Sequence, residues 1–214
     1  ELPGLNSNNL KGAGLYSDGL IDDSKLVFDL IIDAVHRGAS AINYNEVVSL
    51  TDHGDTKEIT IRDTLNHQER NITCDNLLIA VGPFTDQVMQ KLSIPWEKII
   101  LPSKGTHLWL KKDSLELDEA MVLQTKDNRI IFVIPQRNAI LAGTTEVKLL
   151  EDTEMFDIQA SEEEIQYLID TINEYFPEER ITHDDIISTT AAVRPLVKSP
   201  WSKSSGKTSR KHQV

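Results

Sequence analysis

The sequence predicts a mixed fold that combines α/β and α+β features in a chain of 214 residues. Three observations predict it. Short apolar and polar alternations between residues 41 and 61 are typical of an antiparallel meander. A continuously apolar run at 77–81 leads through a glycine into a helix, which is the α/β pattern. After Pro95, further strand-like runs and one long helix indicate an antiparallel sheet with flanking helices.

The first predicted element is a helix over about residues 24–37. Asp22 and Asp23 are suitable N-cap residues, and Gly38 is a natural stop. The apolar residues between them recur at helical spacing, which predicts one apolar face.

The meander is predicted from three runs, 41–44, 47–50 and 58–61, which are separated by turn residues at 53–55 and followed by a turn at 66–67. The run at 77–81 is apolar throughout, as in a strand buried on both faces of a parallel sheet. A short helix is predicted after it, over about 84–92.

In the second half, strands are predicted at 106–110, 121–123, 129–134, 139–142 and 185–193. Ser161 and Glu164 have the spacing of a capping box, which starts a helix that runs to about Phe176. The change of pattern near 96–100 suggests a domain boundary there.

Composition excludes several classes of protein. The net charge of −12 argues against general nucleic-acid binding, because phosphate contacts need clustered Lys and Arg. The single cysteine, Cys74, excludes a disulfide framework, and no His/Asp/Glu cluster has metal-ligand spacing. From Lys198 to the end there are five basic residues and no acid, which predicts either a basic tail or a loop that binds an anion.

The turn after the apolar run is the first candidate site. Gly82 and Pro83 would let a ligand approach the backbone, and the following helix N-terminus with Asp86 would favour an oxygen-rich cofactor. An ordinary strand-to-helix turn, with Thr85 or Asp86 as cap, explains the same residues.

Two further segments place polar side chains at strand ends. Lys104 and His107 flank a glycine, and a histidine there can act as a general base or orient a hydroxyl, or it can be structural. Thr144 and Thr145 end another strand, where they line either a substrate pocket or a tight hairpin.

Arg194 lies in an apolar, proline-stiffened segment, where burying an unpaired charge is costly. Its planar fork suits a carboxylate or a phosphate, so it either pairs internally or binds an anionic ligand. Arg210, in the basic segment, either adds a second cation or belongs to a solvated tail.

Taken together and in order, these segments resemble the FAD-dependent glycerol-3-phosphate dehydrogenases and oxidases, within the wider group of flavoproteins that oxidise amines and hydroxy acids. The Lys-Gly-x-His, Gly-Thr-Thr and Val-Arg-Pro-Leu elements resemble the glycerol-phosphate branch most closely. The matching segments are YSDG at 16–19, AVGPFTD at 80–86, KGTH at 104–107, GTTE at 143–146, VRPL at 193–196 and SRKH at 209–212.

The resemblance implies the domain organisation. Residues 1–98 would be the remainder of an FAD-binding domain with its β-meander, 99–197 an antiparallel-sheet substrate domain, and 198–214 a basic loop or tail. The family's Gly-x-Gly-x-x-Gly turn and its C-terminal part are not in this sequence, which therefore resembles an internal fragment. We expect the 214-residue chain by itself to bind FAD weakly and to be inactive.

The resemblance also implies oxidation of sn-glycerol 3-phosphate to dihydroxyacetone phosphate, with a hydride passing to FAD and the electrons then to a quinone or oxygen. By position, His107 and Arg194 would be catalytic. Arg194, Arg210, Thr144, Thr145 and Lys104 would bind substrate, and Gly82, Pro83 and Asp86 would contact the cofactor. No metal is implied. A cytoplasmic location is expected, with peripheral contact at the cytoplasmic face of the membrane.

Two alternatives remain open from the sequence. One is another FAD-dependent amine or hydroxy-acid oxidase, whose carboxylate substrate would also need an arginine. The other is a non-catalytic domain that keeps this fold.

Overall fold

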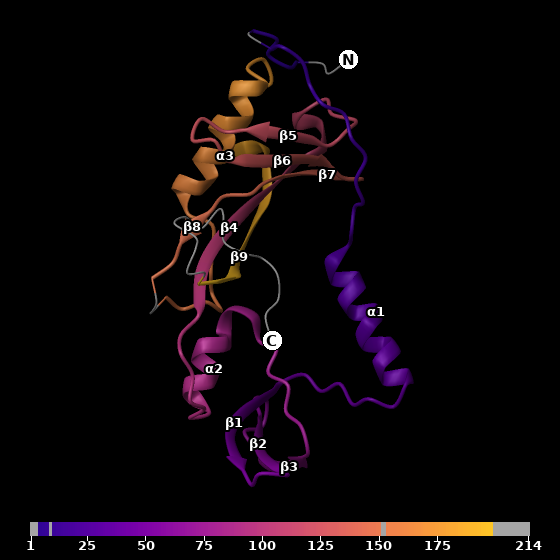
Figure 1. Ribbon diagram of the computed structural model, residues 1–214. Helices are drawn as coiled ribbons and strands as arrows, with labels where there is room; N and C mark the ends of the chain where they lie inside the picture. The colour runs from indigo at the N-terminus through magenta and orange to yellow at the C-terminus, as the bar shows by residue number, and fades with distance from the viewer. Residues whose placement is uncertain (1–3, 9, 151–152, 199–214) are drawn as a thin grey trace. The chain divides into compact units, whose positions relative to one another are not determined.

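The computed structural model describes residues 4–8, 10–150 and 153–198 (Figure 1). These residues form two compact units. One unit contains residues 80–88 and 96–198 together with the N-terminal residues up to Leu10, and the other contains 11–79 and 89–95. The division falls within helix α2 (Thr85–Lys91). The assignment of 1–98 and 99–197 to two domains stays a prediction.

The smaller unit holds helix α1 (Asp23–His36) and a three-stranded antiparallel sheet of β1 (Asn45–Asp52), β2 (Lys57–Asp63) and β3 (Glu69–Cys74). An antiparallel meander is therefore confirmed, but its third strand, β3, lies outside the predicted runs. Asp22 caps α1 by accepting a hydrogen bond from the backbone N–H of Lys25 at 2.9 Å, and Gly38 follows the helix with a φ of +97°. The predicted start and stop of this helix are thus both confirmed.

The strand predicted at 41–44 does not form. Tyr44 has a φ of +53°, in the left-handed region, and this interrupts extended backbone. Its carbonyl accepts hydrogen bonds from the backbone N–H and the hydroxyl of Thr64. The first strand consequently begins one residue later, at Asn45.

The strand predicted at 77–81 does not form either. All strand pairings among the described residues are antiparallel, and none includes this run. Leu78 is 86% exposed. The helix after it does form, as a short 3₁₀ turn at Gly82–Phe84 followed by α2.

The larger unit is built on a six-stranded antiparallel sheet in the order β5-β6-β7-β4-β8, with β9 pairing with the other edge of β4. The mixed α/β class is confirmed. The structure adds the two-residue strand β8 and extends the last strand beyond 193. The bounds are β4 Ile100–Lys111, β5 Met121–Gln124, β6 Ile130–Pro135, β7 Ala139–Gly143, β8 Val147–Lys148 and β9 Ile186–Val197.

Helix α3 (Glu162–Tyr175) covers one face of this sheet (Figure 1). Its capping box of Ser161 and Glu164 is present as predicted. The helix buries Leu168, Ile169 and Ile172 in a core with sheet residues that include Leu108 and Ile131. Burial of each such side chain contributes about 1.5–3 kcal/mol, so this core fixes the sheet on which the candidate site lies.

Candidate active site

His107 and Arg194 project from the same face of the six-stranded sheet. In the pairing of β4 with β9, Ser103 lies opposite Arg194, and His107 lies opposite Thr190. Opposed residues of an antiparallel pair project to one side, and residues two apart on a strand share a face. His107 and Arg194 therefore share one face of the sheet. Leu108, which packs into the core under α3, lies on the other face.

Each of these two side chains lies over a glycine. A Cβ atom added to Gly105 would lie 2.0 Å from Nη2 and 2.4 Å from Cζ of Arg194. A Cβ atom added to Gly143 would lie 2.6 Å from Cδ2 of His107. Since a side chain at either glycine would overlap its neighbour, Gly105 and Gly143 are what allow the two functional groups to lie against the sheet.

Arg194 is oriented by the corner after β7. Its Nη2 donates to the hydroxyl of Thr144 at 2.6 Å, and its Nη1 donates to the carbonyl of Thr145 at 3.3 Å. Both acceptors are uncharged oxygens, and they orient the guanidinium, which stays protonated at any pH near neutral.

His107 is half-buried, and two effects lower its pKa below the ordinary value of 6.5. The larger is burial, which disfavours the charged imidazolium, and the second is the positive charge of Arg194. The imidazole is neutral at pH 7 for this reason. A neutral imidazole beside a fixed cation can accept a proton from a hydroxyl group.

Lys104 and Thr145 are directed to the other side, into the α3 face. Nζ of Lys104 lies 2.6 Å from Oε2 of Glu164, and the hydroxyl of Thr145 donates to Oε1 of Glu164 at 2.6 Å. The structure does not bring these two side chains together with His107. Thr144 does lie on the side of His107, because its hydroxyl accepts a hydrogen bond from Arg194. The prediction that Lys104 and Thr145 touch substrate receives no support from their geometry.

The turn at Gly82 is open. Gly82 has a φ of +55°, and no atom lies within 4 Å of the position a Cβ would take, so the backbone there is accessible to a ligand. Pro83 is the next residue of the 3₁₀ turn, and the hydroxyl of Thr85 donates to the carbonyl of Gly82 at 2.7 Å.

Asp86 has a local structural role. Its carboxylate accepts from the indole N–H of Trp96 at 2.8 Å, and from the backbone N–H groups of Ile99 at 3.2 Å and Ile100 at 3.0 Å. These bonds tie α2 to the start of β4. Nothing in this geometry directs Asp86 towards a cofactor.

Some predictions fall on other parts of the chain. Arg210 lies outside the described residues, as does nearly all of the basic segment 198–214.

Within the described residues, no group of three or more His, Cys, Asp or Glu side chains could hold a metal ion. No helix in the described ranges is long and apolar enough to cross a bilayer.

Sequence reasoning missed Gly105, Gly143 and Glu164 as parts of the site. Glycine in a strand interior signals close approach of another group, which could have identified the first two. Glu164 is predicted as a helix cap, but its ion pair with Lys104 joins residues 60 positions apart, and no local pattern reveals such a contact.

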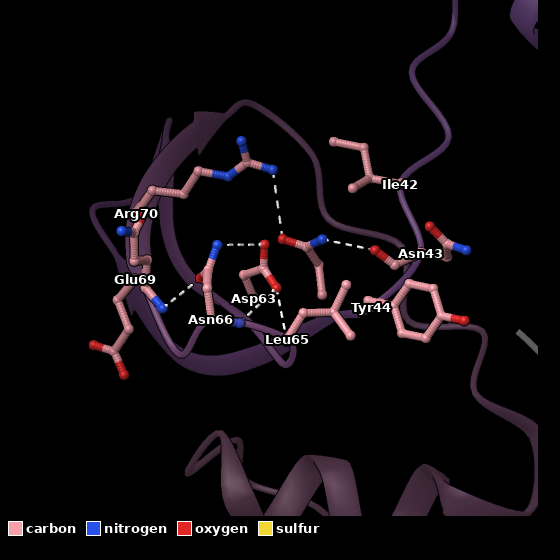
Figure 2. Close-up of a pocket in the computed structure, with 10 residues that line it drawn as sticks. Ile42, Asn43, Tyr44, Asp63, Leu65, Asn66, Glu69 and Arg70 are labelled. Atoms are coloured by element: carbon pink, nitrogen blue, oxygen red, sulfur yellow. Dashed lines mark hydrogen bonds between the residues drawn. The ribbon is translucent and has the colours of Figure 1, made fainter.

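A cavity of about 360 Å³ lies in the smaller unit, between the segment before β1 and the turn that joins β2 to β3. Figure 2 shows Arg70, Asn66 and Asp63 on one side of it and Ile42 and Tyr44 on the other. None of the predicted site residues lines it. Its polar side chains bond mainly to one another, as in the contact of Asn66 with Asp63 at 3.1 Å.

Known proteins resemble this chain over most of its length. The family described as FAD dependent oxidoreductase matches residues 1–208. A mitochondrial glycerol-3-phosphate dehydrogenase of Arabidopsis thaliana is 34% identical over 96% of this chain and 33% of its own length. The aerobic glycerol-3-phosphate dehydrogenase of Bacillus subtilis is 32% identical over 91% of this chain and 35% of its own length.

Among solved structures, the glycerol-3-phosphate dehydrogenase of Bacillus halodurans, determined with FAD, matches with a TM-score of 0.86 and 30% identity. The match covers 92% of this chain and 40% of that one. An L-proline dehydrogenase from P. horikoshii shares the fold, with a TM-score of 0.58 and 15% identity. The chain spans about a third of the length of the curated relatives it matches. By its fold and by a family match over nearly its whole length, the chain belongs to the FAD-dependent oxidoreductases.

Proposed function

We propose that this chain provides the substrate-binding sheet and part of the FAD-binding region of a glycerol-3-phosphate dehydrogenase. The reaction is the oxidation of sn-glycerol 3-phosphate to dihydroxyacetone phosphate. The observation that carries the proposal is the shared face on which Arg194 lies over Gly105 and His107 lies over Gly143. That face offers one permanent cation and one neutral base, which are the groups that a phosphorylated alcohol requires.

Arg194 binds the phosphate group of the substrate. The planar guanidinium donates to phosphate oxygens, and charge-assisted hydrogen bonds of this kind contribute about 1.5–3 kcal/mol each. The hydroxyl of Thr144, at 2.6 Å from Nη2, fixes the direction in which the guanidinium points. Arg210 supplies a second cation in this proposal.

His107 accepts the proton of the C2 hydroxyl at a ring nitrogen. Its lowered pKa keeps that nitrogen unprotonated at neutral pH. Arg194 also limits the charge that His107 can carry, because a protonated imidazole beside a guanidinium is unfavourable. The imidazolium of His107 therefore releases its proton readily after each turnover.

The residues present fit one side of an FAD site. The backbone at Gly82, with its positive φ and free space around the Cβ position, permits close approach of a flavin or its side chain, with Pro83 beside it. When bound, FAD supplies the acceptor for the hydride that leaves C2. The sequence holds no glycine-rich loop for the pyrophosphate, so we propose that the 214-residue chain alone binds FAD weakly and does not turn over.

The electrons pass onward to a quinone or to oxygen in this proposal, from a cytoplasmic protein that touches the membrane surface. The support is the basic composition of 198–214, which suits anionic lipid. Sedimentation with vesicles that contain anionic lipid, compared with neutral vesicles, measures this contact directly. Equal binding to both kinds of vesicle, or to neither, contradicts the membrane contact.

The test of the main proposal is a steady-state assay of the gene product that contains this chain, loaded with FAD. Glycerol 3-phosphate, glycine, sarcosine and lactate are offered with a dye as electron acceptor. We expect dye reduction with glycerol 3-phosphate at a kcat/KM at least about 100-fold above the others, because they lack a phosphate for Arg194. Faster reduction with an amine or a hydroxy acid contradicts the proposal.

A further inference from the structure

Thr145 connects the two faces of the sheet. Its hydroxyl donates to Oε1 of Glu164 at 2.6 Å and accepts from the backbone N–H of Thr106 at 2.9 Å. Its carbonyl accepts from Nη1 of Arg194 at 3.3 Å, on the face of the candidate site. The side chain is 3% exposed, so the hydroxyl is occupied under α3 and is not available to substrate.

Glu164 is the fixed end of this connection. It is 4% exposed, and its carboxylate also accepts from the hydroxyl of Thr106 at 3.0 Å, from Lys104 at 2.6 Å and from the backbone of Ser161 at 3.1 Å. Burial raises the pKa of Glu164, but these donors together outweigh burial and lower it below its ordinary value. The carboxylate is therefore held ionised by donors from β4, from Thr145 and from the N-cap of α3.

We propose that Glu164 is a positioning residue for Arg194. Through the hydroxyl of Thr145 it fixes the corner formed by Thr144 and Thr145, and both of these residues hold the guanidinium over Gly105. The inference rests on the proposed function of Arg194 in binding the substrate phosphate. It assigns Thr145 and Lys104 to the support of the site, on the far side of the sheet, in place of direct substrate contact.

The geometry makes the connection short. From Oε1 of Glu164 to the guanidinium there is one residue, Thr145, with hydrogen bonds at both of its ends. The adjacent Thr144 makes the 2.6 Å bond to Nη2. Loss of the Thr145 hydroxyl leaves a buried carboxylate and the backbone N–H of Thr106 each short of a partner, so the corner relaxes and Arg194 moves with it.

The experiment compares Thr145→Val, which removes the hydroxyl, with Thr145→Ser, which keeps it. Thr171→Val is the matched control: Thr171 is another buried threonine of the same unit, whose hydroxyl bonds within α3 to the carbonyl of Tyr167 at 2.8 Å. Glu164→Gln is a second variant, for the case in which Thr145→Val does not fold. All are made in the FAD-loaded gene product that contains this chain.

The first readout needs no turnover. NMR of isotope-labelled histidine rings gives the pKa of His107, with His107→Gln to assign its signal. Arg194 is the charged group that acts on His107, while the cross-strand neighbours Thr190 and Gly143 carry no charge. We expect Thr145→Val and Glu164→Gln to raise the pKa of His107 towards its value in Arg194→Ala, and Thr145→Ser and Thr171→Val to leave it unchanged.

The second readout is KM for glycerol 3-phosphate. We expect Thr145→Val to raise KM about 3- to 10-fold with a smaller change in kcat, and to have no further effect on an Arg194→Ala background. An unchanged pKa of His107 in Thr145→Val and Glu164→Gln overturns the inference, as does an equal shift in Thr171→Val. Absence of glycerol 3-phosphate oxidation in the unmodified protein overturns the proposed function, and the titration still decides the role of Glu164.

Discussion

The guanidinium of Arg194 lies directly over Gly105 because that position has no side chain. Two hydrogen bonds to the Thr144–Thr145 corner orient it, and its charge lowers the pKa of His107. In the proposed function this one residue has two effects: it supplies the cation for an anionic substrate, and it keeps the neighbouring imidazole unprotonated.

Replacing Arg194 with alanine removes both effects. We expect KM for glycerol 3-phosphate to rise and kcat to fall, with kcat/KM at least about tenfold lower, because a charge-assisted hydrogen bond to phosphate is lost. Steady-state kinetics of the FAD-loaded gene product measure this, with Arg137→Ala on an exposed turn as the control. An unchanged kcat/KM in Arg194→Ala would remove this residue from the site.

The lowered pKa of His107 predicts the acid side of the pH profile. The base is lost on protonation, so kcat/KM should fall about tenfold per pH unit below a pKa that lies under 6.5. The unfolded chain takes up this proton at higher pH than the folded protein does, so the free energy of unfolding should also decrease as the pH falls below 6.5.

His107→Gln tests whether His107 is the group whose protonation produces the acid limb of the pH profile. We expect kcat about 100- to 10,000-fold lower, and the acid limb of the profile that belongs to His107 should disappear. Persistence of that limb in the variant, or near-normal turnover, would assign the proton transfer to another group.

Gly105→Ala tests whether the position of Arg194 over Gly105 matters for function. The added methyl group would lie 2.0 Å from Nη2, so the guanidinium must move, and KM for glycerol 3-phosphate should rise in the same direction as in Arg194→Ala. Gly14→Ala is the matched control, since nothing lies within 4 Å of its Cβ position. Equal kinetics in Gly105→Ala and the control would mean that the position of Arg194 over Gly105 has no functional role.

Among the secondary-structure elements, β4 contributes most to the site. It pairs with β7, β8 and β9, carries His107 on one face and Leu108 and Leu110 on the other, and begins where Asp86 accepts three hydrogen bonds. The position of His107 therefore depends on a strand that is fixed along its length, and Asp86 fixes its first residues.

Asp86→Ala separates a structural role from a cofactor role. We expect the free energy of unfolding to decrease by about 1–3 kcal/mol, because two backbone N–H groups and the Trp96 indole lose their acceptor. Thermal or denaturant unfolding measures this, and flavin titration of the same variant measures the affinity for FAD. A large loss of FAD affinity without a loss of stability would show that Asp86 binds the cofactor.

Elements that depend on local signals are predicted well from the sequence. The caps of α1 at Asp22 and of α3 at Ser161 and Glu164 are confirmed, because a cap is satisfied by residues within one turn. The strand expected at 77–81 fails because a strand needs a neighbour, and apolar composition does not supply one.

The same limit applies to the site residues: local motifs identify them but do not determine where their side chains lie. His107 and Arg194 lie on one face of the sheet, and Thr144 accepts a hydrogen bond from Arg194, while their roles in the reaction stay a prediction. Lys104 has equally suitable chemistry, yet it projects to the opposite face, where it pairs with Glu164. Which face a strand residue occupies depends on register and on the bounds of the strand, and a motif alone does not determine either.

For the molecule as a whole, the two units do not separate the substrate residues from the cofactor residues that the resemblance implies. The larger unit contains all the predicted site residues that the structure describes, while the smaller contains α1 and the meander. Because the match covers about a third of the relatives' length, we propose that the catalytic cycle requires more of the protein than these 214 residues. FAD affinity and turnover are therefore properties to measure on that gene product.

The most direct test is a crystal structure of the FAD-loaded gene product with dihydroxyacetone phosphate bound. We predict phosphate oxygens at about 2.7–2.9 Å from the guanidinium of Arg194, and the C2 oxygen within about 3.2 Å of a ring nitrogen of His107. A bound product that leaves both Arg194 and His107 without contact would contradict the account.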